Sequence, residues 1–167
     1  RYWSTTWFGG GPAGDPGDPI PTWLEKPGFA WDGDAADISA AVNQGRFLVT
    51  HRDHGSKTLW GDPYYTVNNV QALTNGSKLP VLFSMNCQTG WFDDETDGSY
   101  SNALCFSEAW ERNLNGGAIG IVAASRSSYS GHNDRLCWGW VDAIWPGFIP
   151  SYTPFGTPFD EPLFEMG

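Results

Sequence analysis

The sequence predicts an α/β fold with a mostly parallel sheet flanked by helices. Three short apolar runs, at residues 47–50, 81–85 and 118–124, have the length and composition of strands. The middle run, VLFSM, is nearly continuous in apolar character, which is typical of a strand covered on both faces. Helical patterns lie between these runs, and such alternation is typical of a parallel sheet.

The first helix is expected just before the first strand. Asp34 or Asp37 can cap its start, because aspartate favours the N-cap position, and Gly45 supplies a C-terminal glycine signal. After the first strand, a short helical turn is expected over residues 67–73, and the Asn-Gly pair at 75–76 ends it. The second strand follows this turn.

Two longer helical segments complete the pattern. A helix over residues 102–114 stops at a pair of glycines and leads into the third strand. A last helix is expected over residues 133–145.

Composition divides the chain into three regions. Residues 1–33 are rich in Gly, Pro and Asp, so we expect an ordered loop region there. Residues 34–146 hold all the periodic segments and form the expected α/β subdomain. Residues 147–167 are rich in proline and show no periodicity, which predicts a C-terminal extension that covers a surface or leads to another domain.

Charge and hydropathy exclude two classes of partner. The chain has 167 residues, enough for one domain, and 19 acidic residues against nine Lys and Arg give a net charge of −10. This charge repels phosphates, so we expect no nucleic acid partner. The apolar runs fall far short of the roughly 20 residues that span a bilayer, so we expect no membrane span.

Reactive side chains follow the first two predicted strands. The first strand leads to His54 and Gly55, and the second leads to Asn86 and Cys87. Because the carboxyl ends of parallel strands lie at one edge of a sheet, His54 and Cys87 are expected to lie close together if the strands are neighbours.

A thiol beside an imidazole is suited to nucleophilic catalysis. Most of a free thiol is protonated at neutral pH, and an imidazole such as that of His54 can accept the proton from Cys87. The backbone N–H groups of Gly55 and Cys87 could then form an oxyanion hole. A cysteine alone is more often a buried space-filling residue, so the inference depends on the pairing with His54 and Gly55.

Several segments together resemble the gingipain family of cysteine peptidases, over about residues 34–131. They occur in the order of that family: DHGSKTLWGDP, VQALTNGSKLP, FSMNCQTGWFD and GGAIGIVAASRSSY. The resemblance implies a caspase-like three-layer sandwich in which His54 and Cys87 are the catalytic pair and Gly55 supplies an oxyanion donor. It also implies a polypeptide substrate, a secreted or cell-surface location, and an upstream subdomain or other domains of a longer precursor.

The chain departs from the family pattern at three places. Asp53 replaces a small glycine before His54, where a carboxylate either interacts with the histidine or faces solvent. Ser130 follows Tyr129 where gingipains have a tryptophan, so these two residues and Asn86 are candidates for the substrate pocket without an implied basic specificity. The upstream acidic residue that orients the histidine in this family is not assigned here.

Other polar residues have less specific interpretations. No HExxH or CxxC spacing is present, so no metal site is assigned and no cofactor is expected to be required. The acidic segments at 14–19, 32–37 and 93–97 either bind structural calcium or are solvated loops. His51 is expected to be a packed or surface histidine. Cys105 and Cys137 either form a disulfide or remain as two buried thiols.

Three functions remain open from the sequence. The first is a cysteine endopeptidase that works through an acyl-enzyme intermediate on Cys87. The second is a sortase-like transpeptidase of the same family, in which an amine resolves that intermediate. The third is a non-catalytic carbohydrate- or protein-binding module on a peptidase-like scaffold, to which the ten tryptophans could contribute.

Overall fold

A computed structural model describes residues 22–25, 27–93 and 104–146. Most of the predicted loop region, and all of the predicted C-terminal extension at 147–167, lie outside the described residues. The elements follow in this order: η1 (Thr22–Leu24), α1 (Ala35–Gln44), β1 (Leu48–Arg52), β2 (Gly55–Ser56), β3 (Leu59–Trp60), β4 (Tyr65–Thr66), α2 (Val67–Gln71), β5 (Val81–Met85), α3 (Phe106–Arg112), β6 (Gly120–Ala123) and α4 (Ser130–Ile144).

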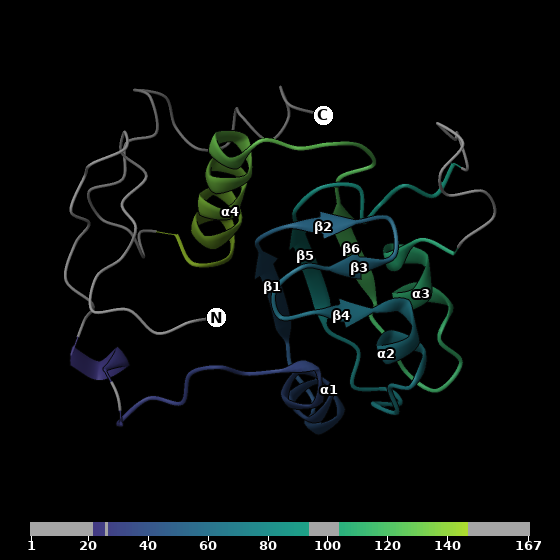
Figure 1. The fold of residues 1–167 in the computed structure, drawn as a ribbon, viewed down its shortest axis with the longest axis horizontal. Helices are drawn as coiled ribbons and strands as arrows, with labels where there is room; N and C mark the ends of the chain where they lie inside the picture. Colours follow the sequence, from purple (N-terminus) through teal and green to yellow (C-terminus); the bar gives the residue numbers. More distant parts are fainter. Residues whose placement is uncertain (1–21, 26, 94–103, 147–167) are drawn as a thin grey trace.

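The central sheet has three parallel strands in the order β1-β5-β6 (Figure 1). Leu48 pairs with Val81 and Arg52 pairs with Met85, so β1 and β5 end at the same level. Residues that follow these two strands therefore leave the sheet side by side.

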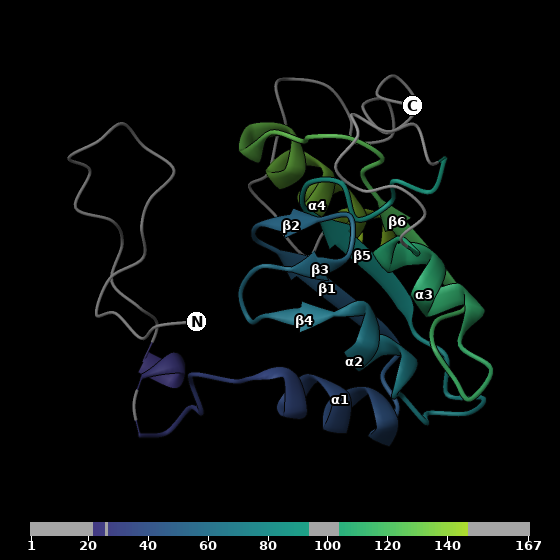
Figure 2. The same cartoon turned by 45° about the vertical axis from the view of Figure 1, so that its right-hand side comes forward.

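Helices cover both faces of this sheet. Leu82 belongs to the core that includes Val70 of α2 and Trp110 of α3. The next residue, Phe83, stacks on Trp140 of α4 with a centroid distance of 4.2 Å. Successive strand residues point to opposite faces, so α4 lies on the face away from α2 and α3, and Figures 1 and 2 show it apart from them. The predicted α/β fold is confirmed.

The predicted cap of the first helix is confirmed, and it uses both aspartates. The Asp34 carboxylate accepts hydrogen bonds from the N–H groups of Ala36 (2.8 Å) and Asp37 (3.1 Å). The Asp37 carboxylate accepts the N–H of Asp34 in return, at 3.0 Å. This reciprocal capping box satisfies N–H groups that the first turn leaves unpaired. Gly45, at φ 100°, ends α1 in a conformation that favours glycine.

The sequence did not predict the small antiparallel sheet β2-β3-β4. Its strands have two residues each, too few to show a period of two. Trp60 and Tyr65 attach it to the core, and both are almost fully buried. Their rings lie 4.9 Å and 6.3 Å, respectively, from the ring of Phe106 on α3.

The bounds of three helices differ from the sequence-based expectation. Helix α2 ends at Gln71 rather than 73. Helix α3 begins at Phe106 rather than 102, because Cys105 is extended and serves as its N-cap. Helix α4 begins at Ser130 rather than 133, and the extended residue Tyr129 is its N-cap.

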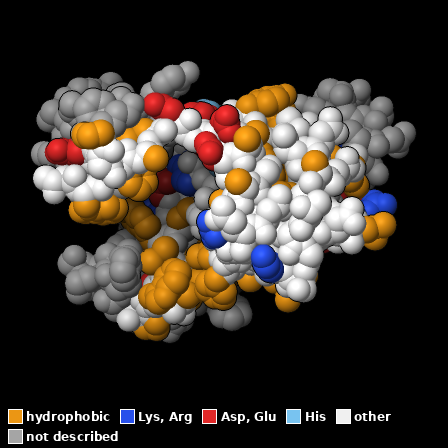
Figure 3. Space-filling view, turned by 90° about the horizontal axis from the view of Figure 1, so that it is seen from below, with side chains coloured by type: hydrophobic (Ala, Val, Ile, Leu, Met, Phe, Trp, Pro, Cys, Tyr) orange, Lys and Arg blue, Asp and Glu red, His pale blue; other side chains and the backbone are white. Residues whose placement is uncertain are grey.

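The surface retains exposed hydrophobic side chains, including Trp23, Phe47 and Leu114. Figure 3 shows one face, on which acidic side chains gather at one side while hydrophobic side chains lie in other areas. Within the described ranges, no helix has the length and apolar composition needed to cross a membrane.

Candidate active site

His54 and Cys87 follow the paired ends of two neighbouring parallel strands. Arg52 and Met85 are the last paired residues of β1 and β5, and each candidate comes two residues later. Cys87 is half-buried and His54 is exposed. The predicted placement at one edge of the sheet is therefore what the strand pairing produces.

Gly55 provides the direct contact between the two segments. A Cβ atom built on Gly55 would lie 3.0 Å from the carbonyl oxygen of Cys87 and 2.7 Å from Oδ1 of Asn86. No side chain fits in that space, so glycine permits this close approach of the two backbones. His54 is bonded to Gly55, so this contact brings the histidine segment and the cysteine segment together.

The loop before α4 contacts the Cys87 thiol through Ser128. The N–H of Ser128 donates to Sγ at 3.4 Å, and the thiol donates to the Ser128 carbonyl oxygen at 3.4 Å. Asn133 Nδ2 donates to Ser128 Oγ at 2.9 Å and fixes this serine. The sequence analysis missed Ser128, although it follows the third parallel strand, at the edge where the other candidates were expected.

Tyr129 and Ser130, two of the predicted pocket residues, lie directly after Ser128. Tyr129 is 72% exposed, and Ser130 is the exposed first residue of α4. Their placement brings exposed side chains close to the segment that contacts the thiol. Asn86, the third predicted pocket residue, differs from them because it is 1% exposed and lies inside the protein.

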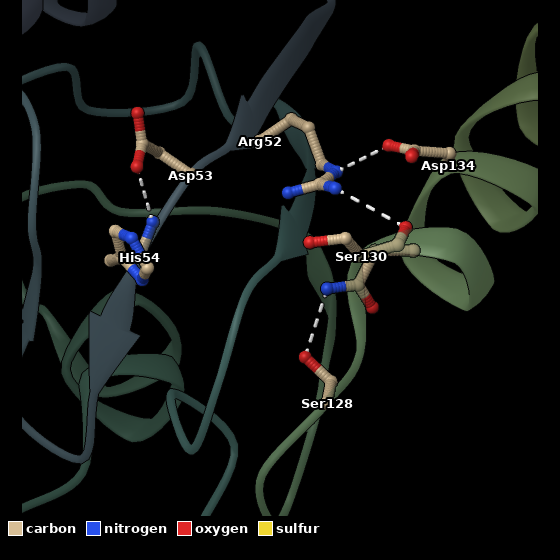
Figure 4. A network of polar contacts seen from close by, with 7 residues as sticks. Arg52, Asp53, His54, Ser128, Ser130 and Asp134 are labelled. Atoms are coloured by element: carbon tan, nitrogen blue, oxygen red, sulfur yellow. Dashed lines mark hydrogen bonds and ion pairs between the residues drawn. The ribbon is translucent and has the colours of Figure 1, made fainter. Parts of the chain in front are cut away.

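An ion pair connects the end of β1 to the start of α4. Arg52 Nε lies 2.8 Å from Asp134 Oδ1, and Arg52 Nη2 donates to the carbonyl oxygen of Ser130 at 3.2 Å (Figure 4). The strand that leads to His54 is thus attached to the helix that follows Ser128. These contacts position two sides of the site relative to each other.

Asp53 interacts with the backbone of His54. Its Oδ1 accepts the His54 N–H at 2.6 Å, as Figure 4 shows. This contact is made with the main chain of the histidine. It fixes the turn between β1 and β2.

His51 is a packed histidine, 8% exposed. Its ring stacks on Trp60 at 4.4 Å with an interplanar angle of 6°. Nε2 lies 3.1 Å from the carbonyl oxygen of Asp62, and Nδ1 lies 2.7 Å from Nδ2 of Asn86.

The other two cysteines are free thiols, as is Cys87. Cys105 is fully buried and Cys137 is half-buried. Burial raises the pKa of both the Cys105 and the Cys137 thiol. The disulfide considered from the sequence is not formed.

No group of three or more His, Cys, Asp or Glu suited to a metal ion occurs in the part of the chain that the structure describes. Of the acidic segments considered for calcium, residues 14–19 and 94–97 lie outside that part. In the second segment, Asp34 and Asp37 are engaged in the cap of α1. Asp93 forms an ion pair with Arg126 at 2.9 Å.

Comparisons with known proteins agree in the family they indicate. The model of peptidase family C25 matches residues 23–161. Lys-gingipain HG66 of Porphyromonas gingivalis is 34% identical over 92 residues, and Lys-gingipain W83 of the same organism is 33% identical over 92 residues. Each match covers 55% of this chain but 5% of the relative, so the chain spans a small part of these proteins.

Solved structures show the same similarity. The crystal structure of the Arg-specific cysteine proteinase gingipain R is 28% identical, with a TM-score of 0.53, and the match covers 66% of this chain and 27% of that one. The complex of the Porphyromonas gingivalis RgpB pro- and mature domains is 27% identical with a TM-score of 0.52, and the match covers 65% and 27%.

Proposed function

This chain belongs to peptidase family C25, and from this premise we propose that it is the part of a cysteine peptidase that carries Cys87 as nucleophile and His54 as general base. The observation that carries the proposal is the close approach of Gly55 to the side-chain amide of Asn86 and to the carbonyl oxygen of Cys87. It brings the histidine segment and the cysteine segment together at the edge where the parallel strands end.

The reaction proceeds through an acyl-enzyme. Cys87 Sγ attacks the scissile carbonyl carbon while His54 accepts the thiol proton, and the N–H groups of Gly55 and Cys87 hold the oxyanion. His54 then donates its proton to the leaving amine, and the C–N bond breaks. A water molecule, deprotonated by His54, attacks the thioester and releases the carboxylic acid and the free thiol.

Ser128 supports the nucleophile. Its N–H and carbonyl groups both lie 3.4 Å from Sγ, so they orient the sulfur in the resting protein. This mechanism requires no metal ion and no cofactor.

The substrate is a polypeptide that binds beside Ser128. Tyr129 and Ser130 are exposed there, and we place them against the residue that precedes the scissile bond. The relatives include proteins named Lys-gingipain and an Arg-specific cysteine proteinase, but Ser130 stands where the gingipain pattern has tryptophan. The preference of this chain is therefore to be measured with substrates that vary at this residue.

The gingipain resemblance also supports a secreted or cell-surface location. Fractionation of the source cells, followed by detection of the protein with an antibody, tests this location. Recovery of the protein in the cytoplasmic fraction alone would contradict it.

The experiment on function is hydrolysis of a peptide library, with products identified by mass spectrometry. Cys87→Ala and His54→Ala are each expected to lower kcat/KM by roughly 10³-fold or more, because the dyad acts as a unit. Cys137→Ala and His132→Gln are the matched controls, since His132 is an exposed histidine of α4, and both are expected to retain activity. Undiminished cleavage by Cys87→Ala would contradict the assignment.

The same assay separates the alternatives. With an amine acceptor added, a transpeptidase gives an amide product in place of the acid. A binding module gives no product with any peptide, and this result would overturn the proposed function.

A further inference from the structure

We propose that Asn86 and His51 are positioning residues, whose buried hydrogen bond holds the nucleophile segment in register with the His54–Gly55 segment. The proposal rests on the proposed function, because it assigns a role in placing Cys87. It also gives Asn86 a role that differs from contact with substrate.

The side-chain amide of Asn86 is buried and forms hydrogen bonds through both its oxygen and its nitrogen. Its Oδ1 accepts hydrogen bonds from Ser84 Oγ at 3.1 Å and from Thr89 Oγ1 at 2.7 Å. Ser84 Oγ in turn accepts the indole N–H of Trp60 at 2.8 Å. All four residues are at most 2% exposed. In this orientation of the amide, Oδ1 faces the two hydroxyl groups and Nδ2 points the other way, toward His51.

The orientation of the amide determines the protonation of His51. Asn86 Nδ2 can only donate, so His51 Nδ1, at 2.7 Å, must accept and carries no proton. The proton of the neutral ring is then on Nε2, which donates to the carbonyl oxygen of Asp62 at 3.1 Å. The stack on Trp60 holds the ring plane in the orientation that both bonds need. His51 is thus fixed in one tautomer and one orientation.

This pair connects both halves of the site. Asn86 directly precedes Cys87, and His51 lies on β1, three residues before His54. A Cβ built on Gly55 would lie 2.7 Å from Oδ1 and 2.8 Å from Cγ of Asn86, so the glycine backbone rests on this amide. A change in the position of the amide therefore moves Gly55 relative to Cys87. The distance between Gly55 and Cys87 sets both the geometry of the oxyanion hole and the approach of His54 to the thiol.

Two substitutions of His51 separate hydrogen bonding from packing. His51→Gln offers a carbonyl oxygen to Asn86 and an N–H group to Asp62, but it loses the aromatic stack. His51→Phe keeps a ring against Trp60 but loses both hydrogen bonds. The proposal predicts that His51→Phe lowers kcat, and the rate at which a chloroacetamide probe alkylates Cys87, by about 10- to 100-fold with KM changed little. His51→Gln is expected to retain most of both rates.

Asn86→Leu tests the other partner of this hydrogen bond, and Asn75→Leu is its matched control. Asn86→Leu removes the amide and is expected to lower both rates by the same 10- to 100-fold factor. Asn75 is also a buried asparagine, with hydrogen bonds of 2.8 to 2.9 Å to Lys78 and Gly117, but it precedes β5 and lies at the other end of the sheet. Asn75→Leu is expected to destabilise the protein and to leave the rates of its folded form unchanged.

Each outcome decides between the two proposals. If the wild type neither cleaves peptides nor reacts at Cys87, the proposed function is overturned. If the wild type is active and His51→Phe, shown to be folded by circular dichroism, matches or exceeds His51→Gln, the positioning role is overturned and the proposed function stands. A rise in KM alone in Asn86→Leu would return Asn86 to the substrate pocket and also overturn the positioning role.

Discussion

Gly55 lies where the segment after β1 meets the segment that contains Asn86 and Cys87. The space that a Cβ would need is filled by the Asn86 amide and by the Cys87 carbonyl oxygen, at 2.7 Å and 3.0 Å. The Asn86 amide is the end of a side chain, but buried hydrogen bonds hold it in place, and the Cys87 carbonyl belongs to the backbone. A methyl group at this position must move the backbone.

Gly55→Ala is therefore expected to lower kcat/KM by about 10²-fold, because a small displacement of reacting groups has an effect of that order. Gly120→Ala is the matched control, since nothing lies within 4 Å of its Cβ position. Peptide hydrolysis measured for both variants tests the prediction. Wild-type activity in Gly55→Ala would show that the close approach at Cys87 has no role.

Buried titratable groups at the residue scale make stability depend on alkaline pH. Burial raises the pKa of Cys105 and of Cys137 above the ordinary value of 9.0, and that of Tyr65 above 10.0. Each group keeps its proton more tightly in the folded state than in the unfolded state. The resulting stabilisation is complete below pH 9 and is lost as the pH rises through the raised pKa values.

The midpoint of urea unfolding is accordingly expected to fall between pH 8 and pH 10. Cys105→Ala removes one of these groups, so its own midpoint is expected to fall less over the same interval. Equal midpoints of the wild-type protein at the two pH values would contradict the raised pKa values.

Among the contacts between elements, the contact of β1 with α4 is expected to affect activity more than stability. Arg52 and Asp134 have side chains that are 31% and 45% exposed, so solvent screens their attraction. Such pairs contribute about 0.2–1 kcal/mol. Yet Arg52 joins the strand that leads to His54 with the helix that follows Ser128.

Arg52→Leu is expected to lower the free energy of unfolding by no more than about 1 kcal/mol, and to lower kcat/KM by a larger factor than that small loss of stability produces. Arg112→Leu is the control, because Arg112 pairs with Glu108 at 3.7 Å within α3 and is more exposed. Equal kcat/KM values for the two variants would show that the contact between β1 and α4 does not position the site.

Elements with local signals could be predicted from the sequence. Helix α1 matches because Asp34 and Gly45 determine its ends locally, and β5 matches because its apolar run lies between polar segments. The start of α3 could not be predicted from the sequence. Cys105 is extended, and the next residue, Phe106, donates its N–H to the Lys57 carbonyl oxygen at 2.7 Å. That bond joins segments far apart in the chain, and no local pattern reports it.

At the scale of the whole molecule, the topology explains which site residues could be anticipated. His54 and Cys87 were accessible to sequence reasoning because one rule, the shared edge of parallel strands, places both. The role of Asn86 was not accessible, since it depends on the register that sets His51 and Ser84 opposite each other. Ser128 required the knowledge that β6 lies next to β5.

The chain is a small part of the relatives it matches, covering 5% of the Lys-gingipains and 27% of gingipain R. The geometry at Cys87 is nevertheless built from three neighbouring strands and α4, all within residues 48–144. We therefore expect this unit to hold the Cys87 thiol in the geometry that the proposed function requires.

Reaction with a panel of peptidyl acyloxymethyl ketones tests whether Cys87 is the nucleophile, with the intact mass of the protein measured and the modified residue identified by peptide mapping. We expect addition of one peptidyl group at Cys87 and none in Cys87→Ala, because Cys105 is fully buried and Cys137 lies on the side of α4 that faces Phe83 of the sheet. Modification at Cys105 or Cys137 instead, or no modification by any member of the panel, would contradict it.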